Sequence, residues 1–448
     1  MTDGMSAAGP SQDVNCAPSL GSALADSAEE ATRVGALPAQ RCGIDSVEIA
    51  RIERLLRENA GEALWRFFTP QELADAGEGP GRAASLAARF AAKEACVKLF
   101  PREAALAQVE PSDFSVARDN YGAPQVVLGP RAEMLAGRYH LGPIALSMTH
   151  DRTSAQAVAV AQPAAVRVPL AGRLLYHLLP LRRRVILDNL RRVYGDALDE
   201  DQIVDLAKAH YGHLWRLAGE FFRFRWLSQQ RKLALVRIEN IDAFVRAYLQ
   251  GRGVLLLTGH FGNWEVATVA GIGNFPQLRG RFHFVRRALK PDWFDRLVVR
   301  RFQAAGFGVL PKRGSLDAML DRLTHGDAIV FAFDQHASPP DGIAVPFFGR
   351  PAWTFKSLAI IALATGAPVV PATSWREADG GHVLRFEAPI AAVEHENTNE
   401  AIRLTTSAYN AELERLVLRR PEQWYWVHRR WKDVAQPARK RKLPPANA

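Results

Sequence analysis

The longer, carboxyl-terminal part of the chain contains several short apolar runs, each followed by polar residues. Val254–Leu257 is an uninterrupted apolar run of the length expected for a strand buried on both faces of a parallel sheet. Gly259 ends this run, and Asn263 is a suitable N-cap for a helix that begins at Trp264 and continues to Ala270. Open α/β sheets place their chemistry at the carboxyl ends of their strands, so this turn is the first candidate site.

Three later segments repeat the pattern. These strand-like runs are Arg281–Val285, Ala328–Phe333 and Pro368–Trp375, and they are followed by Arg286, by Asp334 with Gln335, and by Arg376. If the runs lie parallel in one sheet flanked by helices, their polar ends converge on one crevice with His260 and Glu265. The pattern therefore predicts an α/β fold for this part of the chain.

The residue types in this crevice indicate its chemistry. A histidine whose tautomer is fixed by a carboxylate acts as a general base, so His260 with Glu265 as its partner is predicted to deprotonate a hydroxyl group. Arg286 and Arg376 are cations suited to phosphate or another oxyanion. With Asp334, they are predicted to bind the substrate.

Residues 41–162 show a different order of elements. The pattern predicts a strand from Gly43 that passes into the amphipathic segment Ile49–Leu56, a helix from about Arg82 to Phe100, and strands at 114–118, 125–128, 144–149 and 155–161. Thr69, Pro70 and Glu72 form a capping box at the start of a short helix. This order is typical of the α+β class.

The 448 residues are expected to form two domains. We expect a disordered tail at 1–38, a first domain at 39–162, a linker at 163–169, a second domain at 170–435 and a basic flexible tail at 436–448. Two interpretations of Leu174–Arg184 are open. It is either an amphipathic, basic membrane-surface segment or the first helix of the second domain, packed on its sheet.

The composition of the chain indicates which kinds of molecule it binds. The formal charge of +10 and the pI near 9.7 indicate an anionic partner, and no segment resembles a nucleic-acid-binding module. An acidic protein or an anionic membrane is therefore expected. Cys16, Cys42 and Cys96 have neither paired nor metal-binding spacing, which favours a reducing cytosol. The sequence shows neither a signal peptide nor a run of about 18 apolar residues, so membrane contact is expected to be peripheral.

The second domain resembles a known family. His260-Phe-Gly-Asn-Trp-Glu265 is similar to the His-(four residues)-Glu/Asp motif of the lipid A biosynthesis acyltransferases, within the larger glycerolipid acyltransferase group. The resemblance continues through Asp334-Gln335, Val345–Ala352, Arg376 and Pro421–Lys432. It implies that His260 is the base, that Glu265 is its partner, and that an acyl group passes from an acyl carrier protein thioester to a lipid hydroxyl. The family's Arg-Pro and Asn-Pro pairs are here Arg286-Arg287 and Lys290-Pro291, which leaves the acceptor open.

The first domain resembles another family. Glu94 and Lys98 alone are typical of a surface ion pair, and Asp45 alone is typical of a turn. Together, Gly43-Ile-Asp45 and Phe90-Ala-Ala-Lys-Glu-Ala95 with Lys98 resemble the signature of the holo-acyl-carrier-protein synthases. The resemblance implies transfer of 4'-phosphopantetheine from coenzyme A to a serine of the apo-carrier. Attack on a diphosphate favours a hard cation held by few carboxylates, and Asp45 and Glu94 are the implied Mg²⁺ ligands.

The same resemblance assigns further roles. Lys93 and Lys98 are implied to neutralise phosphate charge, with Lys98 as a proton donor to the leaving nucleotide. His150 and Asp151 match a pair near the nucleotide, and Arg51 matches a residue that meets the acidic carrier protein. Members of this family form trimers with active sites between subunits, so a homotrimer is expected.

These observations predict a bifunctional transferase that works on acyl carrier protein, coenzyme A and a lipid or glycolipid acceptor. We expect it in the cytoplasm, in peripheral contact with the anionic inner face of the cytoplasmic membrane. Two alternatives remain open. The first domain is a docking module that holds the carrier without catalysis, or the second domain makes a specialised lipid other than lipid A.

Overall fold

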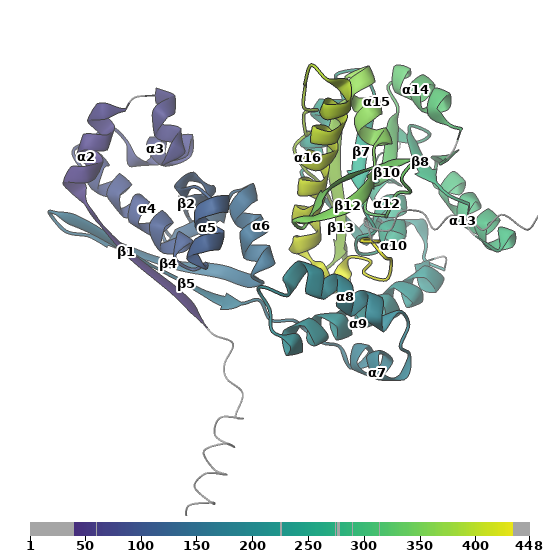
Figure 1. Ribbon diagram of the computed structural model, residues 1–448, viewed down its shortest axis with the longest axis horizontal. Coiled ribbons are helices and arrows are strands. Elements are labelled where there is room, and N and C mark those ends of the chain that lie inside the picture. The colour runs from purple at the N-terminus through teal and green to yellow at the C-terminus, as the bar shows by residue number, and fades with distance from the viewer. Residues whose placement is uncertain are drawn as a thin grey trace, which may run out of the picture.

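The computed structural model describes residues 40–432, except residues 60, 225, 274, 276, 277, 289 and 313. These residues form two domains (Figure 1). The predicted tails, 1–38 and 436–448, lie outside the described residues. The last strand of the first domain ends at Pro163 and the first helix of the second begins at Leu170, so residues 164–169 connect the two.

The amino-terminal domain is an antiparallel sheet, in the order β1-β5-β4, with α4 packed on one face (Figure 1). Its elements are β1 (Arg41–Glu48), α2 (Ile49–Glu58), α3 (Pro70–Ala76), α4 (Arg82–Val97), α5 (Arg102–Gln108), β2 (Phe114–Arg118), β3 (Pro124–Leu128), α6 (Pro130–Arg138), β4 (Leu141–His150) and β5 (Ser154–Pro163). The capping box predicted at Thr69 and Glu72 is present at the start of α3. The α+β class is confirmed.

Gly43 allows β1 and α4 to approach each other closely. A Cβ atom at this position would lie 2.0 Å from the carbonyl oxygen of Ala95 on α4. Asp45, two residues further along β1, is thereby brought beside the end of α4, where Glu94 and Lys98 lie.

The carboxyl-terminal domain is a seven-stranded sheet in the order β6-β14-β13-β7-β10-β8-β9. Its elements before the central strand are α7 (Leu170–Leu178), α8 (Arg183–Tyr194), α9 (Glu200–Phe224), α10 (Gln229–Ala234), β6 (Val236–Glu239) and α11 (Ile241–Tyr248). They are followed by β7 (Val254–Thr258), α12 (Trp264–Gly273), β8 (Phe282–Arg286), α13 (Asp292–Ala304), β9 (Phe307–Pro311), α14 (Leu316–Thr324) and β10 (Ala328–Ala332). The last elements are β11 (Gly342–Phe347), β12 (Arg350–Phe355), α15 (Ser357–Thr365), β13 (Val369–Arg376), β14 (His382–Phe386) and α16 (Thr398–Arg419).

Strands β13, β7, β10, β8 and β9 are parallel, as predicted for the runs that precede the candidate site residues. Strand β14 is antiparallel to β13, so the sheet is mixed. Leu255 and Leu257 of β7 belong to the core that includes α15 and α16, whereas Val254 and Leu256 belong to the core that includes α11 and α12. The central strand is therefore buried on both faces, and the α/β class is confirmed.

The two domains are in direct contact through α6 and α16. A Cβ atom at Gly137 of α6 would lie 2.6 Å from the Leu418 Cβ, so the helices touch at this glycine. The Glu133 carboxylate accepts hydrogen bonds from Arg415 and Arg419 at 2.8 and 3.0 Å. Among the described helices, none is long and apolar enough to span a bilayer.

Candidate functional sites

His260 lies at the carboxyl end of β7, beside the end of the neighbouring strand β10. Its Nδ1 atom is 2.9 Å from the Asp334 Oδ1 atom, and its backbone N–H donates to Oδ2 at 2.7 Å. The Trp424 indole also donates to Oδ2, at 2.9 Å. Asp334 is fully buried, so its carboxylate is held on three sides and fixes both the His260 ring and its backbone.

Glu265 does not contact His260 in the structure. It occupies the first turn of α12 and pairs with Arg301 of α13 at 2.8 Å. The prediction of Glu265 as the histidine's partner is corrected on this geometry: the helix directs Glu265 toward α13, whereas parallel pairing of β7 and β10 places Asp334 at the ring. The sequence pattern predicted the position of Asp334 at this edge of the sheet correctly. Its predicted role, however, was substrate binding, and the structure shows it as the partner of His260.

The buried carboxylate governs the charge of His260. Burial by itself lowers the pKa of the imidazole, but the Asp334 charge and hydrogen bond outweigh burial, and the pKa of His260 is raised above 6.5. Burial opposes ionisation of Asp334 as well, yet the His260 charge and hydrogen bond lower the pKa of this carboxyl. The pair therefore favours an imidazolium beside a carboxylate once the ring has taken a proton.

A cavity of about 1940 Å³ opens beside His260. One part of its wall is apolar and lies beneath α12, where Trp264, Thr268 and Ile272 face it. Another part is cationic, with the exposed residues Arg287, Arg429 and Lys432 and the half-buried Lys356. The cavity thus combines an apolar wall with a cationic opening, and His260 lines it as well.

The two arginines predicted to bind an oxyanion are placed differently from each other. Arg286 lines the cavity, although its guanidinium already pairs with Asp295 at 2.5 Å. Arg376 is buried and donates to both oxygens of Glu220 at 2.5 and 2.6 Å, so it does not reach the cavity. The prediction for Arg376 is therefore corrected to a structural role. The cationic opening was missed because most of its residues do not follow a strand-like run.

Helix α9 fixes the segment that carries His260. Glu220 accepts a hydrogen bond from the Asn263 side chain at 2.8 Å while it holds Arg376. Gly262 has a φ of 51°, and a Cβ atom there would lie 2.7 Å from the Ser374 carbonyl oxygen. The turn after β7 is therefore clamped between α9 and β13, a feature that no local pattern in the sequence indicated.

A second site lies between β1 and α4 of the amino-terminal domain. The Lys98 ammonium donates to the Asp45 carboxylate at 2.7 Å and to the Ile44 carbonyl oxygen at 2.8 Å. Burial and the neighbouring Asp45 charge raise the pKa of Glu94, against the opposing charges of Lys98 and Arg51. The Asp45 charge acts on Glu94, so the two carboxylates lie near each other between β1 and α4, and carboxylates are the ligands that a hard cation prefers.

Among the residues that the structure describes, no group of three or more histidine, cysteine, aspartate and glutamate side chains is arranged to hold a metal. A cation at Asp45 and Glu94 would complete its shell with phosphate oxygens and water, as Mg²⁺ commonly does. The two carboxylates fit such an ion.

Lys93 points away from this site. It is fully buried, and its ammonium donates to Glu72 and to the Phe114 carbonyl oxygen, each at 2.8 Å. The prediction that Lys93 neutralises phosphate charge is corrected on this geometry: along α4 it faces the core, and its charge is matched by Glu72.

The remaining predicted residues of this domain are exposed. His150 ends β4, and Asp151 accepts hydrogen bonds from the backbone N–H groups of Thr153 and Ser154, which lower the pKa of this carboxyl to about 2. Arg51 lies on α2 with its guanidinium 5.4 Å from the centre of the Phe90 ring. Their roles in binding nucleotide and carrier stay predictions.

Comparisons with known proteins agree with both domains. A model of the bacterial lipid A biosynthesis acyltransferase family matches residues 162–433, and a model of the 4'-phosphopantetheinyl transferase superfamily matches residues 41–160. The phosphatidylinositol mannoside acyltransferase of Mycolicibacterium smegmatis is 27% identical over 249 residues, which cover 54% of this chain and 77% of that protein. The lipid A biosynthesis palmitoleoyltransferase of Escherichia coli is 28% identical over 198 residues, or 44% of this chain and 61% of that protein. The holo-[acyl-carrier-protein] synthase of Moorella thermoacetica is 41% identical over 122 residues, or 27% of this chain and 91% of that protein.

Proposed function

Because the chain belongs to the bacterial lipid A biosynthesis acyltransferase family through residues 162–433 and to the 4'-phosphopantetheinyl transferase superfamily through residues 41–160, we propose that its two transferase domains serve one acyl carrier protein. The amino-terminal domain attaches 4'-phosphopantetheine from coenzyme A to a serine of the apo-carrier. The carboxyl-terminal domain moves an acyl chain from that arm to a lipid or glycolipid hydroxyl. The observation that carries the proposal is the His260–Asp334 pair beside a cavity with apolar and cationic walls.

In acyl transfer, His260 is the general base. Its Nδ1 atom faces Asp334, which leaves Nε2 to take the proton of the acceptor hydroxyl. The alkoxide forms a C–O bond to the thioester carbonyl, the C–S bond breaks, and the proton passes from His260 to the leaving thiolate. The Gln335 amide nitrogen, 3.5 Å from Nε2, lies close enough to donate to the oxyanion that develops.

In phosphopantetheine transfer, the serine hydroxyl of the carrier loses its proton to solvent water, and its oxygen bonds to the β-phosphorus of coenzyme A. The bond from that phosphorus to the phosphate oxygen of the nucleotide breaks, and the nucleotide leaves. Asp45 and Glu94 would hold Mg²⁺, which supplies positive charge to the diphosphate oxygens when it is bound. Lys98 is 50% exposed and donates a proton to the leaving nucleotide. His150 and Asp151 contact that nucleotide.

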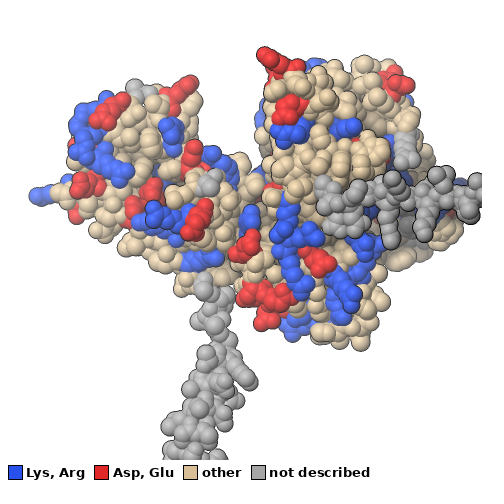
Figure 2. Space-filling view, viewed as in Figure 1, with Lys and Arg blue, Asp and Glu red and all other residues tan. Residues whose placement is uncertain are grey.

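The carrier and the membrane are bound by separate basic surfaces. Arg51, Arg54 and Arg57 are exposed along α2, where an acidic carrier would dock. On the face shown in Figure 2, lysine and arginine side chains also gather over α8. Beside this helix, α7 packs on α9 through Gly172 and leaves Leu174 and Leu178 exposed. The segment thus begins with the first helix of the carboxyl-terminal domain, as one interpretation expected, although this helix packs on α9 instead of on the sheet. Its exposed leucines support the other interpretation, and we place this face on the anionic inner leaflet of the cytoplasmic membrane.

Sedimentation with anionic vesicles tests the membrane surface. The double variant Leu174→Asp and Leu178→Asp should bind vesicles at least tenfold more weakly. Leu106→Asp, at a 70% exposed leucine on the other domain, should bind as the wild type does. Equal binding by all three proteins would remove the proposed surface.

The resemblance to the holo-acyl-carrier-protein synthases also leads us to propose a homotrimer. Ile44 lies on the sheet face away from α4 and is 62% exposed, with exposed Cys42 and Ser46 on the same face of β1. A second copy of the chain would cover this apolar face close to Asp45. Sedimentation equilibrium tests the homotrimer by measuring the mass of the protein in solution. A monomer at micromolar concentration would count against the homotrimer.

The central experiment incubates the purified protein with Mg²⁺, coenzyme A and apo-carriers, and weighs each carrier intact. A gain of one phosphopantetheine, lost in Asp45→Ala, supports the first activity. The acylated holo-carrier is then offered with lipid acceptors, and transfer should be lost in His260→Ala. If the wild type modifies no carrier, the amino-terminal domain is a docking module. Transfer to an acceptor other than a lipid A precursor would identify the specialised product.

A further inference from the structure

The apolar part of the cavity runs along α12, away from His260. Trp264, Thr268 and Ile272 are spaced four residues apart on α12 and all line the cavity, so they follow one face of the helix. The Trp264 ring centre is 5.0 Å from that of His260. Eight residues of helix span about 12 Å, so the wall leads from the histidine to Ile272 over roughly that distance.

Strands of the sheet form the opposite wall. Leu256 on β7, Ala372 on β13, and Leu384 and Phe386 on β14 all line the cavity. Ala372 pairs directly with Phe386 in the antiparallel register. Because β14 is two strands from β7, its side chains lie about 10 Å across the sheet from the strand that precedes His260. Helix and sheet therefore enclose an apolar arm that ends at Ile272, Leu384 and Phe386.

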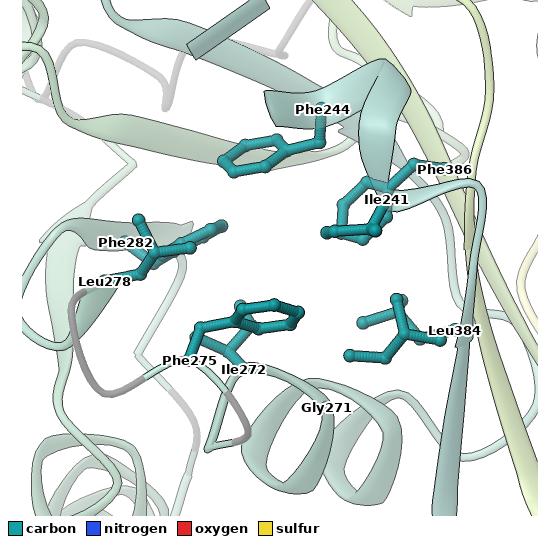
Figure 3. Close-up of a pocket in the computed structure, with 10 residues that line it drawn as sticks. Ile241, Phe244, Gly271, Ile272, Phe275, Leu278, Phe282, Leu384 and Phe386 are labelled. Carbon is teal, nitrogen blue, oxygen red and sulfur yellow. The ribbon is translucent and has the colours of Figure 1, made fainter. Parts of the chain in front are cut away.

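A small void lies on the far side of these three residues. Figure 3 shows it surrounded by apolar side chains from several elements, and its volume is about 10 Å³. Ile272, Leu384 and Phe386 line both spaces, whereas Phe244 and Phe282 line the void alone. A void this small and apolar holds no ligand, so the three shared residues separate a large cavity from a packed core.

The wall has little freedom to retract. The Phe386 ring lies 5.3 Å from the Phe244 ring, which is in turn stacked 5.4 Å from Phe282. Phe386 and Leu384 are 3% and 5% exposed. Close-packed cores resist added volume, so a chain too long for the arm cannot push these side chains back without a steric penalty.

We propose that Ile272, Leu384 and Phe386 form the end wall of the acyl-binding arm and set the longest acyl chain that the carboxyl-terminal domain transfers. This inference rests on the proposed acyl transfer. Each methylene buried in the arm should raise kcat/KM about fourfold, until the chain end meets the wall and kcat/KM falls.

The test measures kcat/KM with acyl carrier proteins whose straight acyl chains increase by two carbons at a time. Leu384→Ala and Phe386→Leu open the arm toward the void, and each should move the preferred chain to a longer one. Thr268→Leu fills the arm and should move it to a shorter one. Phe282→Leu is the matched control: it loosens the same core from the far side of the wall, and the preferred chain should stay unchanged.

Two results would overturn the inference. One is the same preferred chain in the wild type and in all variants that circular dichroism shows to be folded. The other is an equal lengthening in Phe282→Leu, which would reflect general loosening of the core. Calorimetric binding of fatty acids of increasing length gives a second readout of the wall. If the wild type transfers no acyl group, the proposed function fails, whereas a length limit in fatty-acid binding that moves with Leu384→Ala still supports the wall.

Discussion

The proton affinity of His260 depends on one buried carboxylate beside its Nδ1 atom. Asp334 raises the pKa of the ring above 6.5 against the effect of burial. A general base must be neutral before it takes a proton, so kcat/KM for acyl transfer should rise with pH through this raised pKa. The same carboxylate stabilises the imidazolium that forms, which increases the rate once the ring is neutral.

Asp334→Asn separates these two effects. Without the negative charge, burial dominates and the pKa of His260 falls, so the rise in kcat/KM should move to lower pH. The plateau should drop about 100-fold or more, because the imidazolium loses its counter-charge. A pH profile of kcat/KM measures both. Glu265→Gln should leave the midpoint of the rise in place, and a shifted midpoint in this variant alone would return the partner's role to Glu265.

Lys93 of α4 is buried, whereas Lys98, the residue that follows the helix, is half-exposed. Lys93→Met leaves the buried Glu72 carboxylate without its cation and should destabilise the amino-terminal domain by about 3–5 kcal/mol. Lys98→Met removes an exposed ammonium and should change stability by less than about 1 kcal/mol while it lowers phosphopantetheine transfer. Urea unfolding measures the loss of stability expected for Lys93→Met, and modification of the carrier measures the loss of transfer expected for Lys98→Met. A stable Lys93→Met protein that had lost transfer would support the original phosphate role.

At the scale of elements, the predicted strands and helices depend on strong local patterns. The apolar run at 254–257 became β7 (Val254–Thr258), and the segment predicted from Trp264 became α12 (Trp264–Gly273). Strands β6, β9 and β14 were not predicted, because they are recognisable as strands only through pairing within the sheet. The sequence located the site because the order of parallel strands brings His260 and Asp334 to one edge of the sheet. It named the wrong partner for His260 because the contact between α12 and α13, which turns Glu265 toward Arg301, leaves no local pattern in the sequence.

Helix α9 supplies such a contact, and its effect on the site is testable. Glu220→Gln leaves buried Arg376 without a counter-charge and weakens the tie to Asn263, three residues after His260. A shift of about 1 Å at the base costs on the order of 100-fold in rate, so kcat should fall by about that factor. Glu239→Gln, at a more exposed pair with Arg385 on the sheet edge, should keep kcat within about twofold. Equal kcat values for the two variants would show that α9 does not position the base.

At the scale of the whole molecule, a charge network joins the domains. Arg415 and Arg419 of α16 are held within the carboxyl-terminal domain by Glu387, at 3.0 and 2.6 Å. Both also bind Glu133 of α6 in the amino-terminal domain. Arg415 is 8% exposed and the Glu133 side chain 33% exposed, so this network is partly shielded from solvent. The domains therefore share an interface that resists salt better than exposed pairs do, and a tether of residues 164–169 keeps them together.

Removing Glu133 should free the domains from each other without unfolding either one. In Glu133→Gln, both arginines keep Glu387, so the cost is confined to the interface and should be about 1–3 kcal/mol. The connecting residues 164–169 then become accessible more often, and limited proteolysis should cut there at least fivefold faster. Glu110→Gln breaks the exposed pair with Arg131 inside one domain and should leave the rate unchanged. If cleavage is equally slow in all three proteins, the contact between Gly137 and Leu418 holds the domains together, and the charges do not.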